Sequence, residues 1–375
     1  MENAEQNQNK TQGHPLTVLD SERLAVVRLI RSTNIGPKRF FQLYQHFGSA
    51  LSAVENFHEA TKSLPSVSLC PMEGVEKDIE HHKKLGVHLI TFLDDVYPPL
   101  LKQIKDFPPV LSVRGNPSVL KKPFLSIVGS RNASLNGRQF VARLVQGLGA
   151  HGYSIASGFA RGIDTAAHEA SLPFGTVGVL AGGVDIVYPE ENQSLYDKVQ
   201  NNGCMISEMP LGMHPQGKHF PRRNRLISGM SQGIIVTEAR FQSGSMITAD
   251  YALEQGRDVF AIPGSPMDPR CFGSNLLLKQ GAILVTRVED ILDHLQRQEQ
   301  RPTPEEQNQR EAIMGDAKAL LTLLSDVPVS RDKVLDQLDW PAAVFNALCS
   351  ELELEGHLID GPQGLVRGGE ARNSS

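Results

Sequence analysis

Long apolar runs are absent from this chain of 375 residues, in which 40% of residues are hydrophobic and 21% charged. No stretch approaches the roughly 18 apolar residues of a membrane-spanning helix, so no membrane span is expected. The composition is that of an ordinary globular protein. The first residues, MENAEQNQNK, are polar and unlike a signal peptide. We therefore expect a cytoplasmic protein with a disordered tail over residues 1–15.

Cysteine is scarce, and its spacing carries no metal signature. The four cysteines, Cys70, Cys204, Cys271 and Cys349, are widely scattered and form no C-x-x-C pair. Zinc sites built on thiols use closely spaced pairs. The spacing therefore argues against a metal site and for reduced structural thiols in a cytosolic protein.

The fingerprints of common nucleotide-binding sites are also missing. The loop after the strand predicted at 124–128 reads Gly129-Ser130-Arg131, and not G-x-G-x-x-G. The next strand ends at Ser157-Gly158, without the acid that would hold a ribose hydroxyl. No G-K-[ST] sequence supplies a P-loop lysine. We therefore expect no NAD, no FAD and no other cofactor.

Acidic residues are locally absent in a chain whose net charge is −5. Between Phe107 and Ile163 there is no Asp or Glu, while seven Lys and Arg residues give this window a formal charge of seven minus zero, +7. A second acid-free window, from Pro210 to Thr237, contains one lysine and three arginines. Chance placement of surface bases is one explanation. The other is an anion site built from loop amides, helix N-termini and basic side chains.

Residues 124–170 read as two consecutive strand–loop–helix units. The apolar run 124–128 enters the loop at Gly129, and residues 136–151 carry apolar side chains at helical spacing. A second strand at 153–156 leads to a helix that opens at Gly162. Such units form the core of a doubly wound sheet, whose ligands bind at the carboxyl ends of the strands.

The alternation of strands and helices continues to about residue 294. Further strands are predicted at 176–180, 204–207, 234–236, 259–262 and 283–285, and the runs 87–93 and 110–113 predict extra strands at the near side. The fold class is therefore α/β, with an extended Rossmann-like, mostly parallel sheet over residues 85–296.

Smaller units are predicted on both flanks. Over residues 16–80, short helices hinged at Ile35-Gly36 resemble a helix-hairpin-helix or SAM-like bundle. Such a bundle could contact either DNA phosphates or another protein, and the sequence leaves both alternatives open.

Residues 297–312 have the composition of a linker. Residues 313–368 predict three short helices and a hairpin, a winged-helix-like domain. Its recognition helix carries Glu351, Glu353 and Glu355 but no Lys or Arg, which favours a protein-contact or regulatory role over reading a DNA groove.

The basic residues near strand ends suggest a nucleic-acid site. Arg131 lies two residues after the glycine that ends the first strand, where its guanidinium group can reach an anion held on the next helix N-terminus. Phe220 lies within a group of bases, and a ring among bases is the pattern for single-stranded nucleic acid, although Phe220 as core filler is the alternative. Ser243-Gly244-Ser245 opens a helix with amides and hydroxyls for another phosphate. The bases around Phe220 are Lys218, Arg222, Arg223 and Arg225.

The acids near predicted strand ends are Asp164, Asp185, Glu208 and Glu238. Helix capping and pairing with arginines is the favoured interpretation of all four, whereas a hydrolase would need one as general base. No spacing sets His168 or His219 beside a nucleophile. No catalytic residue is therefore predicted.

Six ordered motifs between Leu85 and Asp293 resemble the DNA-processing protein A family, also called DprA or Smf. They are Val128-Gly129-Ser130-Arg131, the stretch from Ser157 to Asp164, Gly182-Gly183-Val184-Asp185 with Tyr188-Pro189, the stretch from Phe220 to Arg225, Glu238-Ala239-Arg240 with Ser243-Gly244-Ser245, and Pro263-Gly264.

The resemblance implies a non-enzymatic protein that binds single-stranded DNA, protects incoming strands in natural transformation and helps load the RecA recombinase, displacing single-strand-binding protein. It also implies a homodimer formed through the Rossmann domain. The phosphate contacts of the family fall on Arg131 and Lys218, and its base-stacking ring falls on Phe220. The candidate DNA-binding set is Ser130, Arg131, Arg161, Lys218, Phe220, Arg222, Arg223, Asn224, Arg225, Ser243, Gly244 and Ser245.

Two other functions compete with this one. A Rossmann-like nucleotide phosphoribohydrolase would use a P-G-G-x-G-T loop, but the nearest stretch, Ala181-Gly182-Gly183-Val184-Asp185, lacks the final Gly-Thr. A pure protein scaffold leaves the depletion of acids unexplained.

Overall fold

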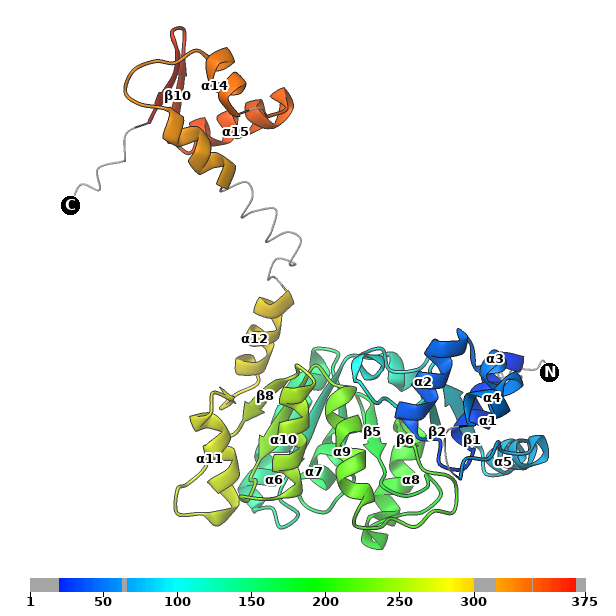
Figure 1. Cartoon of the computed structure of the whole chain (residues 1–375). Coiled ribbons are helices and arrows are strands. Elements are labelled where there is room, and N and C mark those ends of the chain that lie inside the picture. The colour runs from blue at the N-terminus through cyan, green and yellow to red at the C-terminus, as the bar shows by residue number, and fades with distance from the viewer. Residues whose placement is uncertain (1–19, 63–65, 300–314, 339, 369–375) are drawn as a thin grey trace, which may run out of the picture. The chain divides into compact units, whose positions relative to one another are not determined.

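The computed structural model describes residues 20–62, 66–299, 315–338 and 340–368 (Figure 1). The chain divides into two compact units, residues 1–293 and 294–375, which are treated separately. The tail predicted at 1–15 and most of the linker predicted at 297–312 lie outside the described residues.

A nine-stranded sheet forms the centre of the first unit, in the order β1-β2-β6-β5-β4-β3-β7-β8-β9 for the part of the chain described. All neighbouring pairs from β6 to β9 are parallel, whereas β2 is antiparallel to both β1 and β6. This confirms the mostly parallel α/β sheet and its extension at one edge. The strands are β1 (Val87–Thr91), β2 (Val110–Gly115), β3 (Phe124–Gly129), β4 (Ser154–Ser157), β5 (Thr176–Val179), β6 (Cys204–Ser207), β7 (Gly233–Thr237), β8 (Asp258–Ala261) and β9 (Ile283–Leu284).

Helices cover both faces of this sheet. In Figure 1, α9 and α10 lie together in front of the strands, and α6 and α7, which also pack on each other, lie behind them. The chain runs from β3 through β4 and β5 to β6 on one side, and then crosses back to β7 on the other side of β3. The carboxyl ends of β3 and its neighbours therefore form the switch point of the fold, where ligands of such sheets bind. The helices are α6 (Leu135–Ala150), α7 (Ile163–Ser171), α8 (Gln193–Asn202), α9 (His219–Gly229), α10 (Gly244–Glu254), α11 (Phe272–Lys279) and α12 (Glu289–Glu299).

Two glycines allow the loops at this switch point to approach one another. A Cβ atom on Gly129 would lie 2.0 Å from the carbonyl oxygen of Thr237, at the end of β7. Gly162 has a φ of +79°, and a Cβ there would lie 2.3 Å from the carbonyl oxygen of Ser130. The amide of Ile163, at the start of α7, donates to that same oxygen at 3.2 Å. The loops after β3 and β4 are therefore held against each other by backbone contact.

A helical bundle packs against the β1–β2 edge. It comprises α1 (Ser21–Ile30), α2 (Pro37–Phe47), α3 (Ala50–Glu55), α4 (Phe57–Ala60) and α5 (Met72–Lys84), of which the sequence predicted only the first two, hinged at Ile35-Gly36. The rings of Phe40 and Phe41 contact Phe92, which follows β1. An ion pair of 2.9 Å between Arg23 and Asp94 adds a polar link. The bundle is thus fixed to the central sheet.

The second unit has the predicted winged-helix arrangement. A helix over residues 315–323 precedes α14 (Arg331–Leu338), α15 (Ala342–Leu354) and the hairpin of β10 (Leu358–Gly361) and β11 (Gly364–Arg367). Residues 315–368 contain nine acids and four Lys or Arg, a formal charge of four minus nine, −5. On α15, Glu351 and Glu353 are exposed. The unit therefore presents an acidic surface.

None of the helices that the structure describes is both long and apolar enough to cross a membrane. All four cysteines are free, and Cys204, Cys271 and Cys349 are buried. Within the same described ranges, no three His, Cys, Asp or Glu side chains gather as a metal site would require.

Candidate nucleic-acid interface

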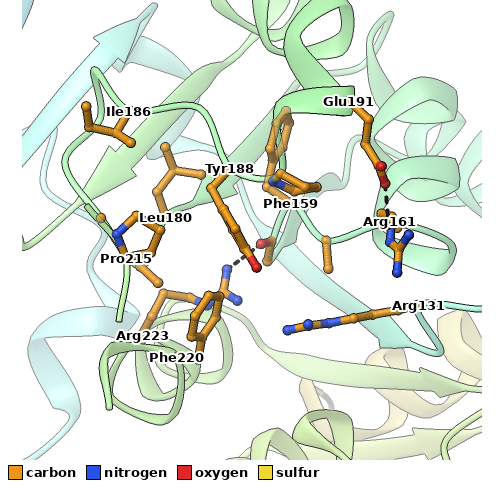
Figure 2. Close-up of a pocket in the computed structure, with 15 residues that line it drawn as sticks. Arg131, Phe159, Arg161, Leu180, Ile186, Tyr188, Glu191, Pro215, Phe220 and Arg223 are labelled. Atoms are coloured by element: carbon orange, nitrogen blue, oxygen red, sulfur yellow. Dashed lines mark hydrogen bonds and ion pairs between the residues drawn. The ribbon is translucent and has the colours of Figure 1, made fainter. Parts of the chain in front are cut away.

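Two adjoining pockets open at the carboxyl ends of the central strands. The β3–α10 pocket, of about 420 Å³, lies between the loop after β3 and the N-terminus of α10. The β4–β5 pocket, of about 210 Å³, lies between the loops after β4 and β5 (Figure 2). Both pockets are lined by Gly158, Ala160 and the side chains of Arg131, Phe220 and Arg223. These three side chains form a wall between the pockets, which we call the shared wall.

Aromatic and cationic groups meet at the shared wall. The guanidinium carbons of Arg131 and Arg223 lie 5.7 and 5.9 Å from the ring centroid of Phe220. Both distances suit cation–π attraction. The ring of Tyr188, which is 48% exposed, lies 5.7 Å from that of Phe220 at an angle of 59°. Figure 2 shows Arg131 pointing toward Phe220 from the opposite side of the opening.

Arg131 and Arg223 differ in what they can offer a ligand. Arg131 is exposed and forms no ion pair with any residue in the described ranges. Arg223 is 6% exposed, and its Nη1 donates to the carbonyl oxygens of Gly158, which follows β4, and Val179, which ends β5. Burial lowers the pKa of Arg223 to about 10, and the nearby Arg131 contributes to the lowering. Arg223 therefore holds the two loops in place, while Arg131 is free to bind an anion.

Asp164 is a buried carboxylate in the β3–α10 pocket. It lies in the first turn of α7 and accepts a hydrogen bond from the Ala160 amide at 3.2 Å. Burial raises the pKa of Asp164 to about 6, although the positive charge of Arg223 opposes the rise. Asp164 thus partly neutralises the cations around it.

The helices α6, α7 and α10 begin near these pockets, and of these three only α10 has a start without a carboxylate. The N-cap of α6, Ser134, is held by Glu238, which accepts from the Ser134 amide at 2.8 Å and from its hydroxyl. The first turn of α7 carries Asp164. The first turn of α10 has no acid, and its N-cap, Ser243, makes no side-chain capping bond. The positive end of the α10 dipole therefore faces the β3–α10 pocket without a carboxylate of its own. The anion-receptive helix is α10, and not α6, which the sequence placed next to Arg131.

The start of α10 is positioned by hydrogen bonds from its neighbours. The Ser245 hydroxyl donates to the Gly129 carbonyl oxygen at 3.0 Å, and Asn224 Nδ2 donates to the Gly244 carbonyl oxygen at 3.1 Å. The Ser243 Oγ atom is buried and has no partner in the structure. Ser130 also lines this pocket, and its hydroxyl accepts from the Asn132 amide at 3.1 Å. These seven residues, five of them from the candidate set, thus line one pocket.

Four predicted bases lie outside the shared wall. Lys218 is exposed at the N-cap of α9, two residues before Phe220, and lines neither pocket. Arg161 lies at the rim of the β4–β5 pocket, where it pairs with Glu191 at 3.2 Å. Arg222 and Arg225 both pair with Glu208, at 2.8 and 2.5 Å. The side chain of Arg225 is 5% exposed, so it has no access to a ligand.

The helix that carries these bases begins earlier than its sequence predicted. Pro221, in a favoured first-turn position, predicts a helix over residues 222–230, but α9 starts at His219. Proline is tolerated there because the first-turn amides of a helix have no intrahelical acceptor to lose. The shift turns Arg223 toward the loops after β4 and β5.

The remaining acids and histidines have structural partners. Asp185 accepts from the Gly212 amide at 2.9 Å. Glu208 pairs with Arg225, and Glu238 accepts from the Ser134 amide. His168 is buried with its Nδ1 2.7 Å from the Thr176 hydroxyl, and burial lowers its pKa to about 3. His219 Nδ1 accepts from the Gln216 amide at 3.2 Å. Capping and pairing, the favoured interpretation of the acids, is what the structure contains.

The pocket residues that sequence reasoning left out of the candidate set include Arg240 and Tyr188. Arg240 is exposed and lines the β3–α10 pocket, and Tyr188 lines the β4–β5 pocket. Both belong to motifs quoted for the family resemblance. Arg240 follows the end of β7 by three residues, which is the strand-end position that marked Arg131 as a candidate.

Comparison with known proteins finds a family model for each part of the fold. The family model described as DNA recombination-mediator protein A matches residues 88–296. The models for a DprA-like N-terminal HHH domain and a DprA winged helix domain match residues 20–80 and 298–364. The chain is 46% identical over 204 residues to DNA processing protein DprA of Streptococcus pneumoniae, which covers 54% of this chain and 72% of that protein. It is 36% identical over 309 residues to protein Smf of Escherichia coli, and this match covers 79% of this chain and 82% of that protein.

Solved structures agree with these matches. The X-ray structure of DNA processing protein A from S. pneumoniae is 33% identical, with a TM-score of 0.62 over 73% of this chain and 98% of that one. A structure of the Helicobacter pylori protein, concerned with its single-stranded DNA binding mode, is 28% identical, with a TM-score of 0.52 over 56% and 96%. The matching models, sequences and structures cover all three parts of the fold, and the chain belongs to the DNA processing protein A (DprA/Smf) family of DNA recombination mediators.

Proposed function

We propose that this protein binds single-stranded DNA at the β3–α10 pocket and the shared wall, without hydrolysing it. The observation that carries the proposal is the placement of Arg131, an unpaired guanidinium beside the uncapped N-terminus of α10. A phosphate there would receive charge-assisted hydrogen bonds from Arg131 and amide dipoles from α10. Arg240 adds a second exposed cation to the same pocket.

Phe220 supplies the contact to a base. Its ring lies between two cations and is partly exposed, so a base can stack on it while the cations attract the adjacent phosphates. Stacking and phosphate contacts tolerate any base, so sequence preference is expected to be weak. Lys218, exposed beside this ring, extends the basic track along the strand.

The cellular role follows from family membership. We infer that the protein protects incoming single strands in natural transformation and assists loading of the RecA recombinase in the presence of single-strand-binding protein. We also infer a homodimer formed through the central sheet domain, and action in the cytoplasm. The resemblance of the six motifs supports these inferences.

The test is binding of labelled single- and double-stranded oligonucleotides across a salt series. Single strands should bind more tightly, and Arg131→Ala should flatten the slope of log K against log salt by roughly 0.7, as expected for one lost phosphate contact. Phe220→Ala should weaken binding by about 1–3 kcal/mol with little change in slope. Arg222→Ala, whose side chain pairs with Glu208, is the matched control and should leave the slope unchanged within about 0.3.

Two outcomes would overturn the proposal. One is that the wild-type protein does not bind single strands, or that the variants at Arg131 and Phe220 bind them as tightly as the wild type does. The other is turnover of a nucleotide monophosphate by the purified protein, abolished by Glu238→Gln, which would favour a phosphoribohydrolase.

A further inference from the structure

The helix α15 lies where winged-helix proteins that read DNA place their recognition helix, but its side chains carry the opposite charge. A helix that enters a DNA groove carries lysine or arginine, which neutralise phosphates. The sequence of α15, AAVFNALCSELEL, contains neither. Glu351 and Glu353 lie in its last turn, and Glu355 is its C-cap. Over residues 315–368 the formal charge is four minus nine, −5, so this unit repels nucleic acid.

The glutamates lie where the helix itself disfavours them. The C-terminus of a helix is the negative end of its dipole, which favours cations in the last turn, and α15 has no base there. Glu351 and Glu355 are four residues apart, a spacing at which like charges on a helix repel each other. Within the described residues, Glu351 and Glu353 form no ion pair, and Glu355 has His357 at 3.9 Å. Contacts inside the unit therefore leave most of this negative charge without a partner.

Exposed apolar side chains share one face of α15 with these acids. Val344, Ala347, Glu351 and Leu354 follow the spacing of a single helix face, and all four are exposed. Leu354 is 89% exposed and Val344 is 47% exposed. We call these four residues, with Glu355 beside them, the α15 face. A different side of the helix fills the core of the unit, through Phe345, Leu348, Cys349 and Leu352.

The charge of the α15 face selects the chemistry of its occupant. An isologous contact with a second copy would bring Glu351 and Glu355 of the two chains together, and like charges in an interface cost free energy. Nucleic acid is excluded for the same reason. A helical or extended segment that presents apolar side chains beside lysine or arginine matches both features of the face.

We propose that the α15 face binds a basic, amphipathic segment of a partner protein. A lysine or arginine of the partner lies between Glu351 and Glu355, where it relieves their repulsion and the unfavourable dipole. Apolar residues of the partner cover Leu354 and Val344. The inference does not depend on single-strand binding, and it assigns the second unit to protein contact. Because the charges are exposed, the contact weakens as the salt concentration rises.

The experiment measures binding of a fluorescent synthetic peptide to the full chain by anisotropy. The peptide is an amphipathic helix with leucines on one face and lysines on both sides of them. The reference peptide has glutamate in place of each lysine. The lysine peptide should bind and lose affinity in high salt, whereas the glutamate peptide should not bind.

Variants of α15 locate the contact. Leu354→Ala should weaken binding of the lysine peptide roughly tenfold, the loss expected when a leucine buried in the complex becomes alanine. Glu351→Lys should weaken it roughly five- to tenfold at low salt. Glu353→Lys is the matched control, because it makes the same change two residues away, on the other side of the helix. It should bind within about twofold of the wild type.

The folding of the variants is checked by the denaturation midpoint. Lysine in the last turn suits the helix dipole, so neither Glu351→Lys nor Glu353→Lys should lower that midpoint. A lower midpoint for Glu351→Lys alone would show that Glu351 stabilises the fold, and would contradict the inference.

Three further results would overturn the inference. They are equal binding of the two peptides, equal losses for Glu351→Lys and Glu353→Lys, and wild-type affinity in Leu354→Ala. Self-association of the wild type that Leu354→Ala abolishes would assign the α15 face to a second copy, against the inference. The oligonucleotide assay for Arg131 and Phe220 is independent of the peptide assay, so each proposal can fail alone.

Discussion

The buried guanidinium of Arg223 donates a hydrogen bond to the backbone carbonyl oxygen of Gly158, the residue that follows β4. A Cβ atom at Gly158 would lie 2.7 Å from Arg223 Nη1, so the glycine makes room for the guanidinium. We predict that Arg223→Lys lowers the free energy of unfolding by about 1–3 kcal/mol. The reason is that the ammonium group of lysine cannot hold both carbonyl groups in the geometry that the planar guanidinium provides. Denaturant titration measures the change.

The matched control for this variant is Arg131→Lys, on the exposed side of the same wall. It should leave the denaturation midpoint unchanged and retain the salt dependence of single-strand binding, because the charge is kept. Equal stability of the two variants would contradict the structural role assigned to Arg223.

The pH dependence of binding should report on Asp164. Its pKa is raised from 3.8 to about 6, so the folded protein takes up a proton there as the pH falls through 6. That proton removes a negative charge from the β3–α10 pocket. We predict that single-strand affinity rises on the order of threefold between pH 7.5 and 5.5 at constant salt. Asp164→Asn should bind as tightly at pH 7.5 as the wild type does at pH 5.5.

The same group has a defined effect on stability. Because the folded pKa is above the unfolded one, the Asp164 contribution to the free energy of unfolding increases as the pH falls from about 6 to 3.8. His168 acts in the opposite direction, since its folded pKa is lowered from 6.5 to about 3 and stability is lost as the pH falls below 6.5. The difference between wild type and Asp164→Asn isolates the first effect, and a difference independent of pH would contradict it.

Glu238 should behave as a capping residue. Its carboxylate accepts hydrogen bonds from the amide and hydroxyl of Ser134 at the start of α6, and Gly137 leaves space for it. We predict that Glu238→Ala costs about 0.5–2 kcal/mol of stability, as for loss of a helix cap. Thermal unfolding measures this cost. Single-strand binding at a temperature well below the transition should be unchanged, and a selective loss of binding would assign Glu238 to the site instead.

The pair of Glu208 and Arg225 is buried, with side chains 4% and 5% exposed and a separation of 2.5 Å. Glu208→Gln should cost up to about 3–5 kcal/mol, because the buried Arg225 charge then relies on the half-exposed Asp106, 3.3 Å away. The double variant Glu208→Leu, Arg225→Met should recover most of that loss. Arg222→Ala, which removes the exposed partner of Glu208, should cost less than about 1 kcal/mol. Chemical denaturation of the three variants compares these costs.

The central strands and the winged-helix elements could be predicted from sequence because their signals are local. The apolar run that forms β3 ends at a glycine, and the residue pattern predicts helices over 331–338 and 342–354, which are the bounds of α14 and α15. Arg131 and Phe220 were both predicted from sequence as contacts of a single strand, because parallel strands carry their following loops to one edge of a sheet. In the structure both side chains lie on the shared wall.

The direction of individual arginines could not be predicted. Arg222, Arg223 and Arg225 are close in sequence, yet one is exposed and two are buried. Which side chain turns inward depends on the start of α9 and on carbonyl groups far away in the chain, such as that of Val179. Glu238 gives a similar case, because its partner Ser134 is 104 residues away. Such contacts arise from tertiary packing and leave no local pattern.

The shared wall between the two pockets bears on the discrimination between nucleic-acid forms. A duplex exposes its phosphates as readily as a single strand does, so the α10 side alone would not distinguish them. A base that stacks on Phe220 must first leave its own stack and its pair, and opening a duplex costs a few kcal/mol at each such position. The preference for single strands would then arise from the cost of unpairing bases in a duplex. That cost, and with it the preference, would be smaller at mismatches, frayed ends and gaps.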